Sequence, residues 1–181
     1  MTEYCIQAAM FKLPLFFGRF THDFWVLREI KTNKMIAQLH GLATSRKSGQ
    51  VVPIGYRSDH SLRAHCIVYD PQFAYQYRLP VGTYALPIHA YHTVYEEEDS
   101  VQQWMRAIEA VKAINHLNLD YPRGGFRVPL LATINSNSIY HTFAQVMNIP
   151  LHLFDGFFHI GIKASLYEQI KSSISSPENC S

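Results

Sequence analysis

The sequence predicts an α+β protein in which an antiparallel β-sheet packs against helices. Two observations indicate this class. Residues 21–45 have the pattern of a β-hairpin, and residues 99–117 and 136–147 each repeat apolar residues at helical spacing. A chain of 181 residues suits one domain, which we assign to residues 1–174, with residues 175–181 as a disordered tail.

The hairpin is predicted from apolar and aromatic residues at 24–27, the polar turn segment EIKTNK and the returning segment MIAQLHGLA. A turn near residues 30–33 would place residues opposite each other when their numbers sum to about 62–64. A shorter strand is expected in HCIVYD, residues 65–70. The prolines of residues 71–95 predict irregular strands and loops.

The first helix, residues 99–117, follows three glutamates that match the positive end of its dipole, with Asp99 or Ser100 as its cap. The second, residues 136–147, ends before Pro150. Residues 151–162 are predicted to form a strand or hairpin around Asp155 and Gly156. Residues 165–174 are predicted to form a short last helix.

Composition excludes several functions. With 16 basic and 14 acidic residues, the chain has no charge excess that would indicate nucleic-acid binding, and the segment RGGF (123–126) is explained by a turn. No apolar run reaches the roughly 18–20 residues of a transmembrane helix, and residues 1–20 do not resemble a signal peptide. We therefore expect a cytoplasmic protein, or an effector secreted by a non-classical route. Cys5, Cys66 and Cys180 are scattered, which predicts structural thiols in a reducing compartment.

The predicted hairpin register brings His22 close to His40. Two imidazoles on adjacent strands suit a general base and the group that orients it, although partly exposed strand histidines would show the same pattern. Asp23 is predicted to point to the opposite face from His22 and is therefore a poor orienting group for it.

The segment Asn135-Ser136-Asn137-Ser138 opens the second helix. A helix N-terminus offers unpaired N–H groups that favour a nucleophile, and a serine there needs a histidine base. The same residue types are also preferred helix caps. Ser136 is the candidate nucleophile, Ser138 is the reserve, and His159 is the fallback base.

This order of motifs resembles the circularly permuted papain-like families, which are relatives of NlpC/P60 peptidases and include the LRAT-like and PPPDE groups. In several of these families the late helix begins with Asn-Cys-Asn, and the cysteine is the nucleophile. Here Ser136 stands in its place, His22 matches the base and His40 the third polar residue, within residues 20–45 and 133–148.

The resemblance implies a hydrolase (peptidase or amidase) or an acyltransferase that acts on an amide or ester bond of a peptide, protein or lipid acyl substrate without a cofactor. Serine in place of cysteine leaves open an active serine enzyme, an inactive relative, or an introduced substitution. An inactive relative would bind a protein or peptide through the tyrosine-rich middle segment. A third hypothesis is a metal-dependent enzyme using His89 and His92, but no other motif completes such a site, so no metal is expected.

Overall fold

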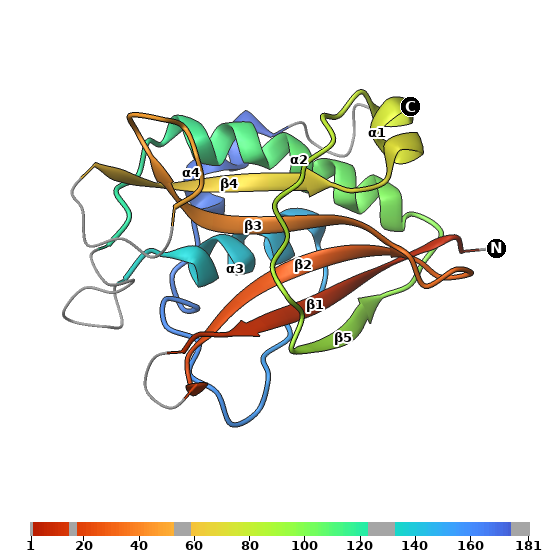
Figure 1. The fold of residues 1–181 in the computed structure, drawn as a ribbon, viewed down its shortest axis with the longest axis horizontal. Helices are drawn as coiled ribbons and strands as arrows, with labels where there is room; N and C mark the ends of the chain where they lie inside the picture. Colours follow the sequence, from red (N-terminus) through yellow and green to blue (C-terminus); the bar gives the residue numbers. More distant parts are fainter. Residues whose placement is uncertain (1, 15–17, 53–58, 123–132, 175–181) are drawn as a thin grey trace.

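A computed structural model describes residues 2–14, 18–52, 59–122 and 133–174. Its centre is a five-stranded antiparallel sheet with the strand order β4-β3-β2-β1-β5 (Figure 1). The strands are β1 (Tyr4–Lys12), β2 (Thr21–Glu29), β3 (Met35–Ser45), β4 (His60–Val68) and β5 (Ala90–Tyr95). The sheet and its helices confirm the predicted α+β class.

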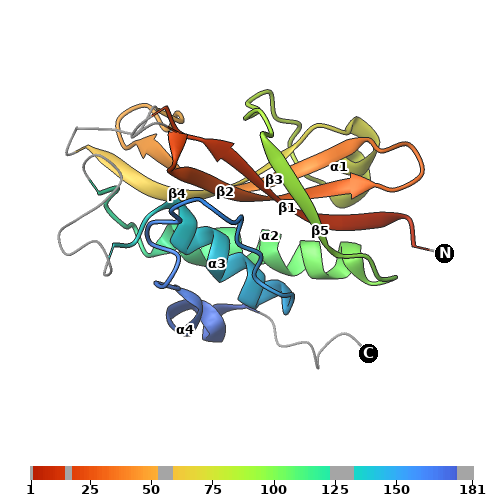
Figure 2. The same cartoon turned by 90° about the horizontal axis from the view of Figure 1, so that it is seen from below.

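The long helices lie together on one face of the sheet (Figure 2). The helices are α1 (Pro71–Tyr77), α2 (Ser100–His116), α3 (Ser136–Met147) and α4 (Tyr167–Ile170), which continues into the 3-10 helix η4 (Lys171–Ser173). Both α2 and α3 were predicted from their spacing. The chain between α1 and β5 crosses the opposite face of the sheet (Figure 1), so both faces are covered.

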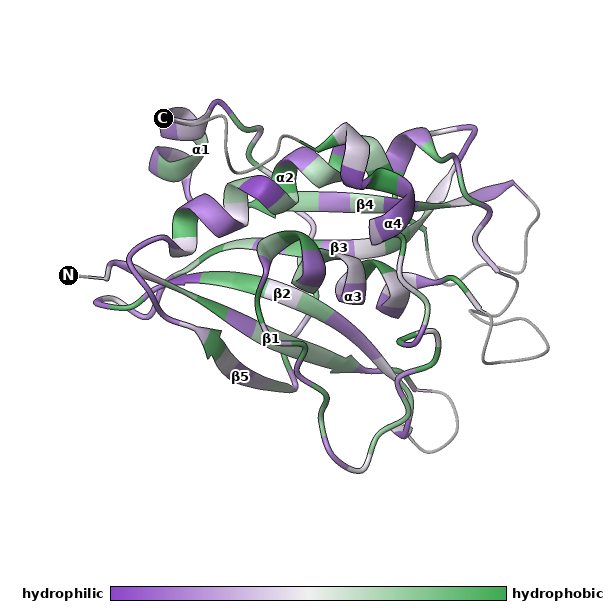
Figure 3. Cartoon of the chain, turned by 180° about the vertical axis from the view of Figure 1, so that it is seen from behind, coloured by the Kyte–Doolittle hydropathy of each residue, from purple (hydrophilic) through white to green (hydrophobic). Residues whose placement is uncertain are grey.

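The hydrophobic core lies between the sheet and the layer formed by α2 and α3. Trp25 and Leu39 face it from the central strands, and Trp104 and Phe143 face it from the helices. All four side chains are fully buried. Trp25 also donates its indole N–H to the carbonyl of Tyr140 at 2.9 Å, which ties β2 to α3. Figure 3 shows hydrophobic residues throughout these neighbouring elements.

The sheet opens between β2 and β3 at one end. These strands pair only from Trp25 to Arg28 of β2, against Leu39 to Met35 of β3. By contrast, β1 pairs with β2 over its whole length, and β3 pairs with β4 as far as Ser45. The beginning of β2 therefore separates from the end of β3, and the start of α3 lies behind the opening in Figure 1.

Three predictions about the elements were incomplete or wrong. The strand β1 was not predicted, and neither was α1 within the proline-rich segment. Residues 151–162 contain turns rather than a strand or hairpin, apart from an isolated bridge between Phe158 and Phe20. The predicted last helix is present as α4 and η4. The predicted tail and the RGGF segment lie outside the described residues, and within the described residues no helix is long and apolar enough to cross a membrane.

Candidate active site

His22 and His40 are in contact across the hairpin, as the register predicted. His22 Nε2 lies 3.1 Å from His40 Nδ1, and the two rings are nearly parallel with centroids 5.4 Å apart. Both side chains are buried, and Phe24 packs beside them at 4.5 Å from the His40 ring. The pair therefore forms a dry, ordered contact on the face of the sheet that is crossed by the chain between α1 and β5.

A glutamine and a tyrosine extend this contact, and the orientation of the Gln38 amide sets the tautomer assigned to both rings. The Gln38 amide nitrogen faces the carbonyl of Leu86 at 3.5 Å, so its oxygen faces His40 Nε2 at 2.9 Å and accepts a hydrogen bond from it. The Tyr69 hydroxyl lies 2.6 Å from the same oxygen and 2.8 Å from the carbonyl of Tyr84, and it can donate its one proton to only one of them. Because His40 Nε2 carries the proton, His40 Nδ1 is an acceptor, and His22 Nε2–H donates to it.

It follows that Nδ1 of His22 holds the lone pair in the neutral ring. The hydrogen bond that His22 makes with a described side chain uses its other nitrogen, Nε2. The buried series of hydrogen bonds from Tyr69 through Gln38 and His40 thus ends at His22, whose Nδ1 can accept a proton. A histidine that acts as a general base needs one free ring nitrogen, while a second group bonded to the other nitrogen orients the ring.

The buried histidine pair should make the protein sensitive to acid. Burial lowers the pKa of His22 to about 4, and burial together with the neighbouring His22 ring holds the pKa of His40 well below its ordinary value. Between pH 6.5 and pH 4 the unfolded chain gains protons that the folded protein does not. The free energy of unfolding should therefore fall as the pH falls, by about 1.4 kcal/mol per pH unit for each such ring, or about 3 kcal/mol in total for His22.

Urea unfolding at pH 7 and pH 4.5 measures this loss. The variant His22→Gln should lose part of the acid sensitivity, whereas His116→Gln, which changes an exposed histidine at the end of α2, should retain it. Equal acid sensitivity in His22→Gln and wild type would contradict a neutral, buried His22.

The Asn-Ser-Asn-Ser segment does cap α3. The side chain of Asn135 accepts the N–H of Asn137 at 3.0 Å, and Ser138 Oγ accepts the N–H of Asn135 at 3.1 Å, which completes a capping box. Ser138 Oγ also lies 2.8 Å from the carbonyl of Gly161, to which it donates. Since this hydroxyl is fully buried and committed to its backbone partners, Ser138 is a structural residue and not a reserve nucleophile.

Asn137 fills the opening between β2 and β3. Its side-chain oxygen accepts the N–H of Asp23 at 3.0 Å, and its side-chain nitrogen donates to the carbonyl of Thr21 at 3.2 Å. These two backbone groups flank His22 on the edge of β2 that β3 leaves unpaired. The amide of Asn137 therefore replaces a strand partner and holds the start of α3 against β2.

Ser136 lies against the other side of the opening. A Cβ atom on Gly41 would lie 3.0 Å from Ser136 Cα, so only glycine allows α3 to approach β3 this closely. Ser136 is 8% exposed. Burial raises the pKa of Tyr121, which lies near Ser136, to about 12. Ser136 thus lies against Gly41 of β3, on the side of the sheet that faces α3.

The structure shows no hydrogen bond from Ser136 to His22 or to His40. The side of Gly41 that faces α3 is opposite to the side from which the His40 ring projects, and alternation places His22 and Asp23 on opposite sides of β2. The side-chain hydrogen bonds of His22 and His40 with described residues are to each other and to Gln38. Contact between Ser136 and His22 therefore requires the serine side chain to turn into the opening between β2 and β3.

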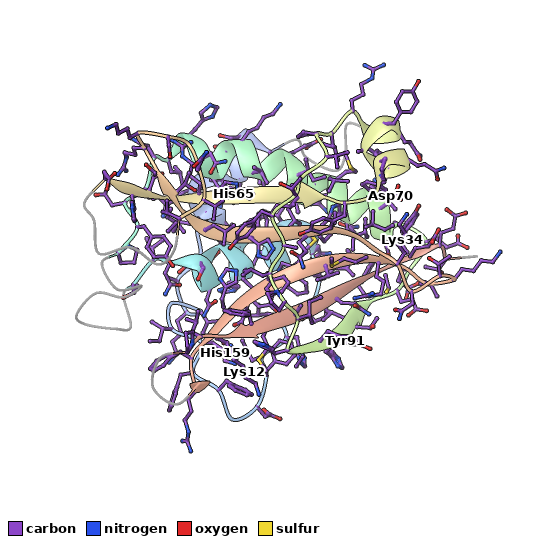
Figure 4. All side chains as sticks on the ribbon, viewed as in Figure 1. Lys12, Lys34, His65, Asp70, Tyr91 and His159 are labelled. Carbon is purple, nitrogen blue, oxygen red and sulfur yellow. The ribbon has the colours of Figure 1, made fainter. Side chains whose placement is uncertain are left out.

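His159 belongs to a second polar contact that the sequence did not predict. Its Nδ1 lies 2.5 Å from Oδ2 of the fully buried Asp23, and its Nε2 lies 3.0 Å from the carbonyl of Phe154 (Figure 4). Burial alone would lower the pKa of His159, but the Asp23 carboxylate outweighs it and raises that pKa. Because both ring nitrogens are engaged, His159 is not available as the fallback base.

Gly161 ends the loop that holds His159. Its φ is +84°, and a Cβ atom there would lie 2.7 Å from Cγ of Asn135, the residue that caps α3. Gly161→Ala should therefore lower the free energy of unfolding by about 3 kcal/mol, through backbone strain and displacement of the cap. Gly156→Ala is a matched control, since its φ is +81° but no atom lies within 4 Å, so about 1 kcal/mol is expected there. Equal losses in urea unfolding would exclude the clash with Asn135.

The remaining candidates do not form a site. His89 Nδ1 accepts the N–H of Lys12, whereas the His92 ring stacks on His152 with centroids 4.1 Å apart, so the two histidines face different neighbours. In the described part of the chain, no three His, Cys, Asp or Glu side chains are grouped to hold a metal ion. Cys5 and Cys66 are free thiols, and burial raises the pKa of Cys66 to about 12.

A cavity of about 220 Å³ lies at the other end of the sheet, lined by residues that include Tyr4, Tyr77 and Glu97. Tyr4 pairs with Glu29 at the far end of β2 from His22, so this cavity is separate from the candidate site.

Comparison of the chain with family models, with curated proteins and with solved structures finds no match, so the candidate site rests on its own geometry.

Proposed function

We propose that the protein is a papain-like hydrolase or acyltransferase in which Ser136 attacks an amide or ester carbonyl and His22 is the base. The observation that carries this proposal is the series of hydrogen bonds from Gln38 through His40 to His22. Because His22 Nε2 contacts His40, His22 Nδ1 is left to accept the proton. With a pKa of about 4, His22 is neutral at pH 7 and able to accept a proton.

In the proposed reaction, Ser136 Oγ bonds to the carbonyl carbon as its proton passes to His22 Nδ1. His40 stabilises the resulting imidazolium through its hydrogen bond. His22 then gives the proton to the leaving amine or alcohol, which departs from the acyl-serine. Water or an acceptor alcohol or amine, deprotonated by His22, finally releases the acyl group and restores the serine.

The start of α3 is suited to the negative oxygen of the tetrahedral intermediate. The N–H groups of Asn137 and Ser138 are used within the cap, but the N–H of Ser136 has no acceptor among the described residues. That N–H and the positive end of the helix dipole are expected to stabilise the oxyanion. To react, the serine hydroxyl has to rotate about χ1 toward His22.

A non-catalytic module that binds a protein or peptide is the second candidate. The burial of Ser136 favours it. So do the exposed aromatic residues of the middle segment, where Tyr75 is 89% and Tyr91 is 58% exposed. Under this proposal the polar contacts around α3 only support the fold.

A fluorophosphonate probe, which reacts with activated serines, separates the two candidates. The enzyme proposal predicts one labelled site at Ser136 by mass spectrometry, no labelling of Ser136→Ala, and normal labelling of the control Ser165→Ala. An ester and amide panel should show activity that Ser136→Ala removes. No labelling, combined with no activity or with activity that Ser136→Ala leaves unchanged, would overturn the enzyme proposal.

A further inference from the structure

Two segments far apart in the sequence meet at the end of the molecule where β1 ends and β2 begins. The N–H of Phe158 donates to the carbonyl of Arg19 at 2.8 Å, and Phe158 forms an isolated bridge with Phe20. In Figure 1 the loop that precedes α4 extends beyond the sheet at this end, where Figure 4 labels Lys12 and His159. We call this region, with Lys12, Arg19, Leu153, Phe157 and Phe158, the aromatic tip.

The aromatic tip exposes large apolar side chains. Phe158 is 56% exposed and Leu153 is 43% exposed, while Phe157 is half-buried. The rings of Phe158 and Phe20 lie 5.7 Å apart, which orders Phe158 on the surface. Figure 3 shows the loop to be largely hydrophobic. A cluster of this kind at a protruding end is unusual on a surface that meets only water.

Basic residues accompany these apolar ones. Lys12 Nζ lies over the Phe157 ring at 5.1 Å from its centroid, and Arg19 is exposed beside the Phe158 backbone contact. Neither cation forms an ion pair with a described residue. Asp155, the acidic residue of this loop, also forms no ion pair with a described residue. His159, in the same loop, is paired with Asp23. Cations therefore border the exposed rings.

We propose that the aromatic tip is a docking surface for an anionic membrane. Aromatic side chains favour the interface between headgroups and acyl chains, where Phe158 and Leu153 would lose their contact with water. Lys12 and Arg19 would then face the anionic headgroups, which attract cations on a peripheral protein. The charge is what selects a membrane over a neutral apolar partner. The inference does not depend on the proposed hydrolase activity.

Co-sedimentation of the full chain with lipid vesicles tests the proposal. Wild-type protein should bind vesicles of phosphatidylcholine mixed with phosphatidylglycerol, more strongly than phosphatidylcholine alone. Lys12→Gln with Arg19→Gln should weaken binding to the anionic vesicles by on the order of tenfold, and added salt should do the same. Phe158→Ser with Leu153→Ser should weaken binding to both kinds of vesicle by a similar factor.

Matched variants make each result specific. Tyr75→Ser removes an aromatic side chain that is 89% exposed on α1, at the other end of the fold, and should bind as wild type does. Lys31→Gln with Lys47→Gln removes two other exposed lysines and should also leave binding unchanged. Absence of vesicle binding by wild type, or equal binding by the Phe158 and Leu153 variant, would overturn the proposal. So would a wild-type dimer in solution that this variant dissociates, because the tip would then contact a second copy.

Discussion

Replacing His22 by alanine is expected to lower hydrolysis of the best substrate in an ester and amide panel by on the order of 10³-fold. The imidazole is the group that would remove the proton from Ser136, and the fallback base His159 is bonded through both ring nitrogens. Because Ser136 and His22 would act as one unit, the double variant should be no slower than either single variant. Initial rates at matched protein concentration measure this.

The dependence of the rate on pH gives a separate check. A base whose pKa is about 4 remains neutral down to mildly acidic pH, so kcat/KM should fall only as the pH falls toward 4, rather than near 6.5. His116→Ala, which changes an exposed histidine, should leave both the rate and the profile unchanged. An acid limb near 6.5, or full activity in His22→Ala, would exclude His22 as the base.

Asp23→Asn is expected to cost about 3–5 kcal/mol of folding stability near pH 6, measured by urea unfolding. The substitution keeps the shape of the side chain but leaves the His159 imidazolium buried without its counter-charge. The contact with Asp23 raises the pKa of His159. The contact therefore contributes fully to the free energy of unfolding below pH 6.5, and this contribution is lost as the pH rises through the raised pKa. The cost should therefore be smaller at pH 8.5 than at pH 6.

Asp155→Asn is the control for this experiment, because Asp155 lies exposed in the loop that carries His159. It should change stability by no more than about 0.5 kcal/mol. If Asp23→Asn behaved in the same way, or if its cost did not depend on pH, the contact between Asp23 and His159 would not be an ion pair.

The parts of the fold that follow local patterns were predictable. The polar turn of the hairpin set the pairing of Trp25 with Leu39, and the apolar spacing of residues 136–147 gave α3 with its cap at Asn135. The strand β1 was missed because residues Cys5–Met10 are buried on both faces of the sheet. Such a strand has no alternation of apolar and polar residues, and therefore no signal with a period of two.

The candidate site was predictable only in part, for a similar reason. The contact of His22 with His40 follows from the register of one hairpin, and the placement of Asp23 on the opposite face from His22 follows from strand alternation. The partner of Asp23 is 136 residues away in the sequence, in a loop without regular structure. Tyr121, Gly41 and Gly161 likewise approach α3 through tertiary contacts, and nothing in their local sequence indicates it.

The amide of Asn137 has a consequence for how the protein is made. Its two bonds to β2 span 114 and 116 residues of chain, so the hairpin emerges from the ribosome well before the residue that completes its open edge. Contacts of such long range form late, after the entropy of closing the loop has been overcome. Until α3 arrives, the backbone groups of Thr21 and Asp23 remain open to pairing with another chain. The docking of α3 therefore both covers backbone groups that could pair with another chain and assembles the candidate active site.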